Sequence, residues 1–502
     1  MLSRRTAIMG AFAASASIRT IAQAQNPPGG GSGADSTPRT ILQLQHRNIQ
    51  VNGKPASVFA IRQPDGTFGI TTDVAKPFRV RVENKIDEPS LIHWHGLTPP
   101  WQQDGVPGVS GPPIPPGGSA DYDFPLRFGG TFWMHSHQGL QEQLLMAAPL
   151  IIRDQRDRPD QQEVVIELAD FSFTPPQQIF EQLKKPKPMA STSGSGAATP
   201  GAAAPDLNDV KYDAFLTNGR TLGDPEVVKV EPGGQVLLRI INGSAMSAYH
   251  IDLGQLKGEL VAVDGFAITP VIGSRFPIAV AQRLDISVTA PRDAGAHPVL
   301  ALLEGARNQT GIVLVVGNAS VARVAELAES TSPALTLELE SSLRAREPLK
   351  QMNPDRVHTL NLTGDMAKYI WSINDVAWNK EVPPLPIAKG ERVELVLVNR
   401  TAMPHPMHLH GHEFQVVEID GKRFPGAVRD TVLVTPGRRV VVAFDANNPG
   451  TWAFHCQLLY HHDAPLRLAS AISAFSGSFL NGFAAMPPSY CSKVGHAARK
   501  LG

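Results

Sequence analysis

The sequence has few cysteines, no excess of charge of either sign, and no long apolar run after its first residues. Its two cysteines, Cys456 and Cys491, allow one bridge at most, so a chain of 502 residues is not a disulfide scaffold. Acidic and basic residues balance at 46 each, which gives no electrostatic reason to expect nucleic acid or an anionic membrane as a partner. Beyond the N-terminus we find no segment suited to a stable membrane span.

Glycine and proline are plentiful, with 44 and 43 copies, and they favour many short strands and turns over long helices. Short apolar segments broken by Gly, Pro and Asp begin near Thr40, and segments 78–82, 236–241 and 392–398 are examples. Strands repeated at this spacing predict β-sandwiches or barrels. The length accommodates about three domains of ~150 residues each.

A weak internal repeat also indicates three related domains. In each third of the chain a turn sequence precedes an apolar strand, and an asparagine follows closely: Asn84, Asn242 or Asn399. A unit that recurs once per third predicts three copies of one architecture.

The N-terminus has the features of an export signal. Arg4 and Arg5 precede a short apolar stretch, which Arg19 interrupts, and segment 22–24 fits a small-x-small cleavage site. Paired arginines in this setting resemble a twin-arginine signal, and the stretch is too short for a stable membrane helix. We therefore predict a signal over 1–24 that the twin-arginine export machinery carries to the bacterial periplasm. The alternative is a disordered basic N-terminus.

Histidine is distributed unevenly, and nine of the sixteen histidines lie in four short clusters. Histidine is the commonest metal ligand, and imidazole suits copper, iron, nickel and zinc. Four such clusters in a strand-rich chain, one with an embedded cysteine, predict metal sites. The clustered histidines are His93, His95, His135, His137, His405, His408, His410, His455 and His461.

The spacing within the clusters fits strands. Residues two apart in a strand share a face, ~6.6 Å apart along it, so a pair such as His93 and His95 can present two imidazoles to neighbouring metal ions. In the last cluster His455 and Gln457 share one face while Cys456 points to the other. One strand can then touch two sites, and a thiolate with two imidazoles matches a blue-copper electron-transfer site.

From about Thr40 to Leu466 the chain resembles the three-domain multicopper oxidases, the group that contains laccases and bacterial copper-resistance oxidases. Segment 212–220 is similar to the bacterial copper-resistance branch. The resemblance implies an all-β fold of three cupredoxin-like Greek-key β-sandwich domains. The other stretches that carry it are residues 92–96, 103–107, 130–137, 404–412 and 450–456.

We expect these domains at 38–158, 159–320 and 333–470. The type 1 copper would lie in the third domain, the trinuclear cluster between the first and the third, and the second domain would act mainly as a spacer. Three further segments are predicted: a flexible tether at 25–37, a mobile insertion at 184–205, which is rich in Ala, Ser, Gly, Thr and Pro, and an atypical tail at 471–502.

The resemblance implies a copper-dependent oxidoreductase with dioxygen as acceptor and up to four copper ions. A small donor, a phenolic compound or cuprous ion, would reduce the type 1 copper one electron at a time. Electrons would cross the Cys456–His455 backbone to the trinuclear cluster, where four of them reduce dioxygen to water. The implied ligands are His405, Cys456 and His461 for type 1, His93 and His408 for type 2, and His95, His135, His137, His410 and His455 for the type 3 pair.

Two further positions match or depart from the family pattern. Asp104 matches a family acid near the cluster that would relay protons, and the alternative is an aspartate that stabilises the turn before Gly105. Leu466 stands where many relatives have an axial methionine. Because leucine cannot ligate, the type 1 site would be three-coordinate, which tends to raise its potential.

Gln457 stands where the family has the last type 3 histidine. A glutamine amide is a poor copper ligand compared with imidazole, so one type 3 copper would keep only His95 and His135. That ion would be lost, weakly held or completed by water. This departure keeps two alternatives open: a copper-binding electron shuttle, and a non-enzymatic cell-envelope scaffold of the same fold.

After Leu466 the sequence has no clear strand pattern. Two interpretations stand side by side: a natural segment that covers the substrate face, and the product of a shifted reading frame. The sequence also leaves open the identity of the electron donor and the oligomeric state.

Overall fold

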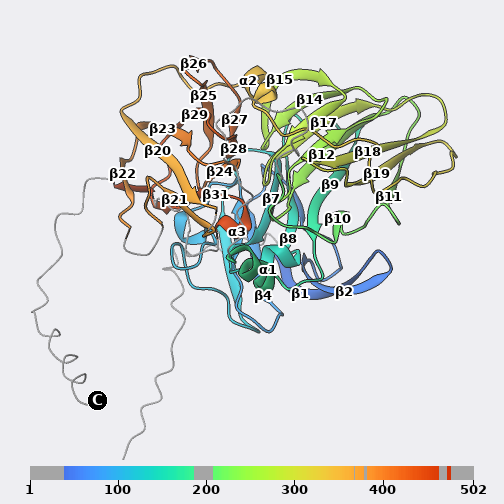
Figure 1. Ribbon diagram of the computed structural model, residues 1–502, viewed down its shortest axis with the longest axis horizontal. Helices are drawn as coiled ribbons and strands as arrows, with labels where there is room; N and C mark the ends of the chain where they lie inside the picture. The colour runs from blue at the N-terminus through green and yellow to red at the C-terminus, as the bar shows by residue number, and fades with distance from the viewer. Residues whose placement is uncertain (1–38, 186–206, 367, 378–381, 463–471, 476–502) are drawn as a thin grey trace, which may run out of the picture. The chain divides into compact units, whose positions relative to one another are not determined.

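The computed structural model describes residues 39–185, 207–366, 368–377, 382–462 and 472–475. β-Strands dominate the regular structure of these residues, as Figure 1 shows, and the predicted all-β class is confirmed. The predicted export signal, the tether and nearly all of the predicted insertion lie outside the described residues. The helices that the structure describes are short: η1 Trp101–Gln103, η2 Gln141–Leu144, α1 Pro176–Leu183, α2 Glu338–Ser342 and α3 Leu459–His462.

The first third of the chain forms two sheets around one apolar core. In β4 every second side chain is buried, so Phe78, Val80 and Val82 enter this core. Such a period of two is what a strand with one solvated face requires. The first sheet has the order β2-β1-β4-β6 (Lys54–Arg62, Thr40–Val51, Phe78–Asn84, Ser119–Phe124), and the second has the order β3-β8-β7-β5 (Ile70–Asp73, Ala147–Arg153, Gly130–Ser136, Ile92–His95).

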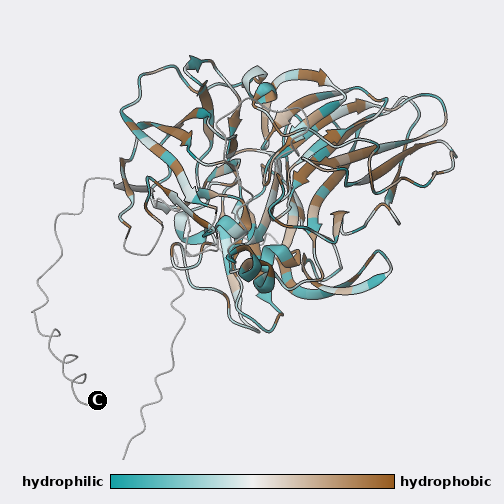
Figure 2. Cartoon of the chain, in the orientation of Figure 1, coloured by the Kyte–Doolittle hydropathy of each residue, from teal (hydrophilic) through white to brown (hydrophobic). Residues whose placement is uncertain are grey.

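The middle third also forms two sheets. Polar and apolar residues alternate along several strands, which Figure 2 shows as teal and brown bands. One sheet has the order β10-β9-β12-β17-β14-β15 (Ala214–Thr217, Gln161–Phe171, Gln235–Asn242, Arg283–Thr289, Gly258–Val263, Phe266–Gly273). The other has the order β11-β19-β18-β13-β16 (Glu226–Val230, Gln309–Val316, Gly295–Leu303, Tyr249–Asp252, Arg275–Ile278).

The last third has a large sheet and two small ones. The large sheet has the order β21-β20-β23-β29-β25-β26, with β27 paired to β25 (Ile370–Ile373, Arg356–Asp365, Arg392–Asn399, Arg439–Asp445, Phe414–Ile419, Lys422–Arg423, Val428–Arg429). The small sheets are β28-β24-β31 (Thr431–Val434, His405–Leu409, Phe454–Cys456) and β22-β32-β30 (Leu385–Ala388, Ile472–Phe475, Thr451–Trp452).

Strand β32 corrects one expectation. The sequence after Leu466 has no clear strand pattern, yet residues 472–475 pair in parallel with β22 and antiparallel with β30. Strand pairing uses backbone N–H and C=O groups, and every residue type except proline has both. The side-chain pattern of a segment therefore does not by itself reveal such pairing.

The repeated asparagines have one structural role. Each ends a strand, β4, β12 or β23, that pairs in parallel with an earlier strand of its own third of the chain. The side-chain amides of Asn84, Asn242 and Asn399 are buried, and each donates to a carbonyl of the following loop while its oxygen accepts a backbone N–H two residues on. Each side chain therefore fixes the turn that leaves its strand.

Candidate metal centre

A thiol and two imidazoles meet where β24, β31 and α3 come together. The Sγ of Cys456 lies 3.5 Å from Nδ1 of His405 and 3.8 Å from Nδ1 of His461. All three side chains are buried, and their ligand atoms lie within 4.8 Å of one another. The hydroxyl of Thr401 lies 2.8 Å from Nε2 of His405, which leaves Nδ1 to face the thiol. This donor set is the one that blue-copper sites use.

Burial tunes the protonation of this cluster. It raises the pKa of the Cys456 thiol to about 12, so the thiolate needs a cation beside it to form. Burial also lowers the pKa of both His405 and His461, which keeps the two imidazoles neutral and able to donate a lone pair. A metal ion would supply the positive charge that the cluster lacks.

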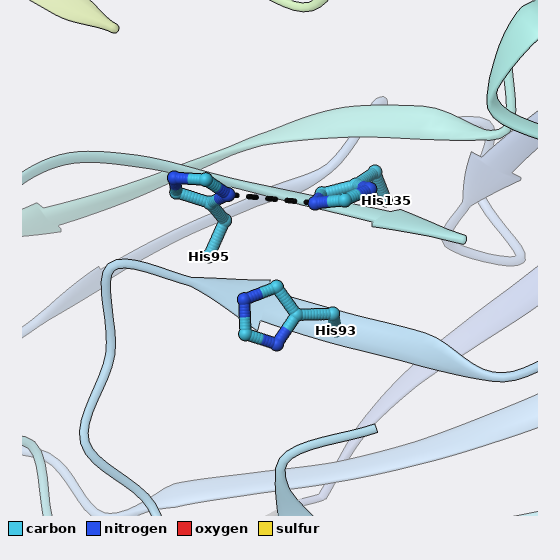
Figure 3. Close-up of side chains that lie close together, drawn as sticks. All are labelled: His93, His95 and His135. Carbon is cyan, nitrogen blue, oxygen red and sulfur yellow. Dashed lines mark hydrogen bonds between the residues drawn. The ribbon is translucent and has the colours of Figure 1, made fainter. Parts of the chain in front are cut away.

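Seven further histidines gather where two strand pairs from distant parts of the chain meet. In β5 and β7, His93 is directly opposite His135, and in β24 and β31, His408 is directly opposite His455. Figure 3 shows the ring of His95 facing the ring of His135. The ring nitrogens of the seven histidines form three all-histidine groups, and within each group the nitrogens lie within 4.8 Å of one another. The groups are His93, His95 and His135; His93, His408 and His410; and His137, His410 and His455.

Ring nitrogens in this region face one another at short range. Nδ1 of His95 lies 3.4 Å from Nε2 of His135, and Nε2 of His93 lies 3.3 Å from Nε2 of His408. Nε2 of His455 lies 2.8 Å from Nε2 of His410. Burial lowers the pKa of His95, His135 and His408, so these imidazoles are neutral. Converging neutral imidazoles are the arrangement that holds metal ions.

Asp104 contacts two of the predicted ligands. One oxygen accepts a hydrogen bond from Nδ1 of His410 at 2.8 Å, and the other lies 3.2 Å from Nδ1 of His93. The residue also ends η1 at a tight turn, because Gly105 has φ +86° and a Cβ there would lie 1.9 Å from the carbonyl oxygen of Ile92. Asp104 therefore contacts the side chains of His410 and His93 and also occupies the turn that the alternative interpretation expected.

Asp430 is a second buried carboxylate at the centre, and the sequence analysis missed it. Its Oδ1 lies 3.0 Å from Nε2 of His95, and its backbone carbonyl accepts from Nδ1 of His408 at 2.9 Å. Burial by itself raises the pKa of Asp430, but the Arg283 guanidinium, 2.9 Å away, holds it well below its usual range. The carboxylate is therefore ionised and able to anchor the imidazole.

Arg283 comes from β17, in the middle third of the chain. The expectation that this third acts mainly as a spacer is therefore too narrow, because its arginine holds the carboxylate that contacts His95. Arg429 and Asp264 extend the same buried network. An isolated Arg or Asp in the sequence has no spacing signal that could have identified these contacts.

Gln457 is buried beside this region, and its Oε1 has no hydrogen-bond partner within the described residues. It lines a small cavity together with His135, His137, His455 and Glu142. Glu142, in η2, was also missed by the sequence analysis. Its Oε2 lies 2.8 Å from Nδ1 of His135, and burial, with the nearby charge of Asp170, raises the pKa of Glu142 well above its usual range.

The thiol cluster has its own carboxylate, whose side chain is 5% exposed. Oδ2 of Asp209 lies 3.6 Å from Nε2 of His461 and accepts a hydrogen bond from the Tyr369 hydroxyl at 3.2 Å. The ring of Trp371 stacks on His461 with the ring centres 4.0 Å apart. His461 is therefore held between an aromatic face and a carboxylate, neither of which the sequence analysis identified.

Comparisons with known proteins agree with this geometry. Sequence profiles described as multicopper oxidase match residues 43–157, 163–319 and 351–473. The chain is 32% identical over 410 residues to multicopper oxidase MmcO of Mycobacterium tuberculosis, covering 79% of each chain. It is 28% identical to copper resistance protein A of Escherichia coli, covering 76% of this chain and 84% of that one.

Solved structures show the same fold. Fet3p, described as a multicopper oxidase that functions in iron import, superposes with a TM-score of 0.72 at 21% identity, covering 86% of this chain and 90% of that one. The laccase from Botrytis aclada superposes with a TM-score of 0.71 at 22% identity, covering 87% of this chain and 88% of that one. The predicted cupredoxin-type architecture is confirmed.

The chain belongs to the multicopper oxidase family. It is a copper-dependent oxidoreductase that couples oxidation of a donor to reduction of dioxygen, and the shuttle and scaffold alternatives are not favoured. Copper fits the residues present, because nine buried imidazoles and one thiol supply the soft nitrogen and sulfur donors that copper prefers. In the part of the chain that the structure describes, no helix is long and apolar enough to cross a membrane.

Proposed function

We propose that His405, Cys456 and His461 hold the type 1 copper, that His93 and His408 hold the type 2 copper, and that five histidines serve the type 3 pair. Bound copper would supply one-electron oxidation of the donor and four-electron reduction of dioxygen to water. The five proposed type 3 ligands are His95, His135, His137, His410 and His455.

One observation carries this assignment. Cys456 and His455 are neighbours in β31, and their side chains lie in different donor clusters. A single peptide bond therefore joins the residue that supplies the electron-accepting thiolate to the residue that supplies an imidazole of the oxygen-reducing site. A covalent link this short suits electron transfer between two buried centres.

The chain's own residues prepare the two sites. Asp104 accepts from His410, Asp430 accepts from His95, and Thr401 contacts His405, so each of these imidazoles is held in one orientation. The imidazoles are at most 3% exposed, which keeps bulk water away from the place where dioxygen reacts. Asp104 is also placed to pass protons, because its carboxylate reaches ligands on both halves of the centre.

We propose that the donor approaches the Asp209 side of His461. This carboxylate, 3.6 Å from Nε2, would accept the proton that a phenol loses on oxidation, or would attract a cuprous ion. His461 would be the point at which the electron enters. Both donor classes predicted from the sequence fit a small negative group at this position.

Three cupredoxin domains at 38–158, 159–320 and 333–470 would place the type 1 site in the third domain and the oxygen site between the first and the third. A twin-arginine signal at 1–24 would deliver the folded protein to the periplasm, where dioxygen and the donor meet it.

Oxygen uptake by the copper-loaded protein tests the proposal. A phenolic donor and cuprous ion are supplied separately, and we expect uptake without accumulation of peroxide. Cys456→Ser is the matched control, because it changes one atom of the buried donor set. Uptake that is equal in the wild type and in this variant would refute the assignment of the type 1 site.

A further inference from the structure

Among the buried oxygens without a hydrogen-bond partner in the described residues, two lie near the proposed ligand His135: Oε1 of Gln457 and Oε1 of Glu142. Gln457 is 3% exposed and Glu142 is 4% exposed, so bulk solvent does not satisfy either oxygen. No hydrogen bond joins the two side chains. Buried polar atoms are nearly always hydrogen-bonded, so we expect a hydrogen-bond donor next to these two oxygens.

Both residues line the same small cavity. Its volume is about 10 Å³, which is roughly the room that one water molecule requires. His135, His137 and His455 also line it, so the cavity opens onto the histidine cluster. A water molecule offers two O–H donors and one oxygen with lone pairs, which matches two acceptor oxygens and one nearby cation.

The second oxygen of Glu142 lies close to His135. Its Oε2 lies 2.8 Å from Nδ1 of His135, whose Nε2 points at Nδ1 of His95. Nδ1 of His135 also lies 3.2 Å from the carbonyl oxygen of Ser136, so Nε2 is the ring nitrogen left to offer a lone pair. Glu142 is thus placed to orient His135 with one oxygen while its other oxygen borders the cavity.

We infer that Glu142 and Gln457 together hold one water molecule that completes the donor set begun by His95 and His135. Gln457 is then a water-holding residue, and Glu142 is a positioning residue for both the water and His135. This inference rests on the copper assignment proposed above.

A ligand of this kind differs from a tethered histidine. Water exchanges with solvent, whereas an imidazole of the chain stays at its position. The copper held by His95 and His135 is therefore expected to be the one that a chelator removes first, while the ions held entirely by side chains remain.

The water itself is tested without copper. A crystal structure of the copper-free protein is expected to show a solvent molecule within hydrogen-bond distance of both Oε1 atoms, and Gln457→Leu is expected to abolish it. This variant leaves the contact between Glu142 and His135 untouched. A cavity without solvent in the wild type, or a Gln457 amide turned to bond Glu142 directly, would overturn the inference.

Copper retention tests the role of the water. In chelator titrations of the loaded protein we expect Gln457→Leu and Glu142→Leu to weaken the most labile copper about 10–100-fold. The blue absorption of the type 1 site should be the same in these variants as in the wild type. If the wild type itself shows no blue absorption, the copper assignment fails, and this result is distinct from a failure of the water inference. Glu304→Gln, at a buried carboxylate that accepts from the backbone of Leu335, is the matched control.

A double variant separates the two roles of Glu142. In a Gln457→His background an imidazole replaces the water, so adding Glu142→Leu should cost less copper affinity than it does in the wild type. If the cost is the same in both backgrounds, Glu142 acts only through His135, and the water is not a ligand.

Discussion

Cys456 and His455 are consecutive residues of β31, yet Sγ of Cys456 lies 3.5 Å from His405 while Nε2 of His455 lies 2.8 Å from His410. The alternation of side chains along a strand makes this possible, because neighbours point to opposite faces. One three-residue strand therefore joins the two donor clusters.

Cys456→Ser should remove the blue colour and nearly all oxidase turnover. Serine keeps the size of the side chain but replaces a thiolate, the soft ligand that favours copper, with a hydroxyl. Visible absorption and oxygen uptake measure the two effects. The copper at the histidine cluster should remain, and its loss together with the blue site would show that the two sites do not load independently.

Gln457→His should add a copper ligand just after β31, at the cavity that Gln457 and His455 both line. We expect a higher copper content per chain and turnover at least equal to that of the wild type, because imidazole binds copper better than an amide does. Atomic absorption and oxygen uptake measure these quantities. No change in either would count against Gln457 as the weak point of the site.

Arg283→Met should destabilise the fold by about 3–5 kcal/mol, because it leaves the buried carboxylate of Asp430 without its partner. Urea unfolding measures the loss. The matched control is Arg275→Met, which breaks an ion pair between Arg275 and Asp252 at a half-exposed site and should cost about 0–1 kcal/mol. Equal effects of the two variants would contradict a structural role for the Arg283–Asp430 pair.

Glu167 predicts a pH dependence of stability. Burial raises its pKa to about 7, although the Arg47 charge acts in the opposite direction. The folded state therefore holds this proton more tightly than the unfolded state, and stability should fall as pH rises from about 4.5 to about 7 and then level off. The expected contribution is about 3 kcal/mol.

Unfolding midpoints at pH 5 and at pH 8, taken for the wild type and for Glu167→Gln, measure the contribution of Glu167. The neutral amide cannot ionise, so the variant should lose less stability across this range than the wild type does. A variant whose stability changes with pH as steeply as that of the wild type would show that other groups cause the dependence.

Local periodicity accounts for what could be predicted. A His-x-His pair on a strand must present both rings on one face, so the pairing of His93 with His95 follows from the spacing alone. The alternation around Cys456 follows in the same way. The asparagine repeat indicated three related units for a physical reason that the structure makes visible, since Asn84, Asn242 and Asn399 each close a turn.

Contacts between distant residues account for what could not be predicted. Asp430 meets His95 across 335 residues of sequence, and Arg283 meets Asp430 across 147. A single buried carboxylate such as Glu142 or Asp209 has the same local sequence signal as an exposed one. Strand β32 was missed because its partners, β22 and β30, are chosen by backbone hydrogen bonds.

The sequence by itself determined the β class and the clustering of the histidines. It also determined that Cys456 and His455 point to opposite faces of one strand, because strand geometry converts spacing directly into side-chain direction. Only the tertiary structure decided which carboxylate orients each imidazole and which oxygens remain unpaired beside Gln457. Those outcomes depend on how separate sheets pack, and packing brings together residues whose positions along the chain have no fixed relation.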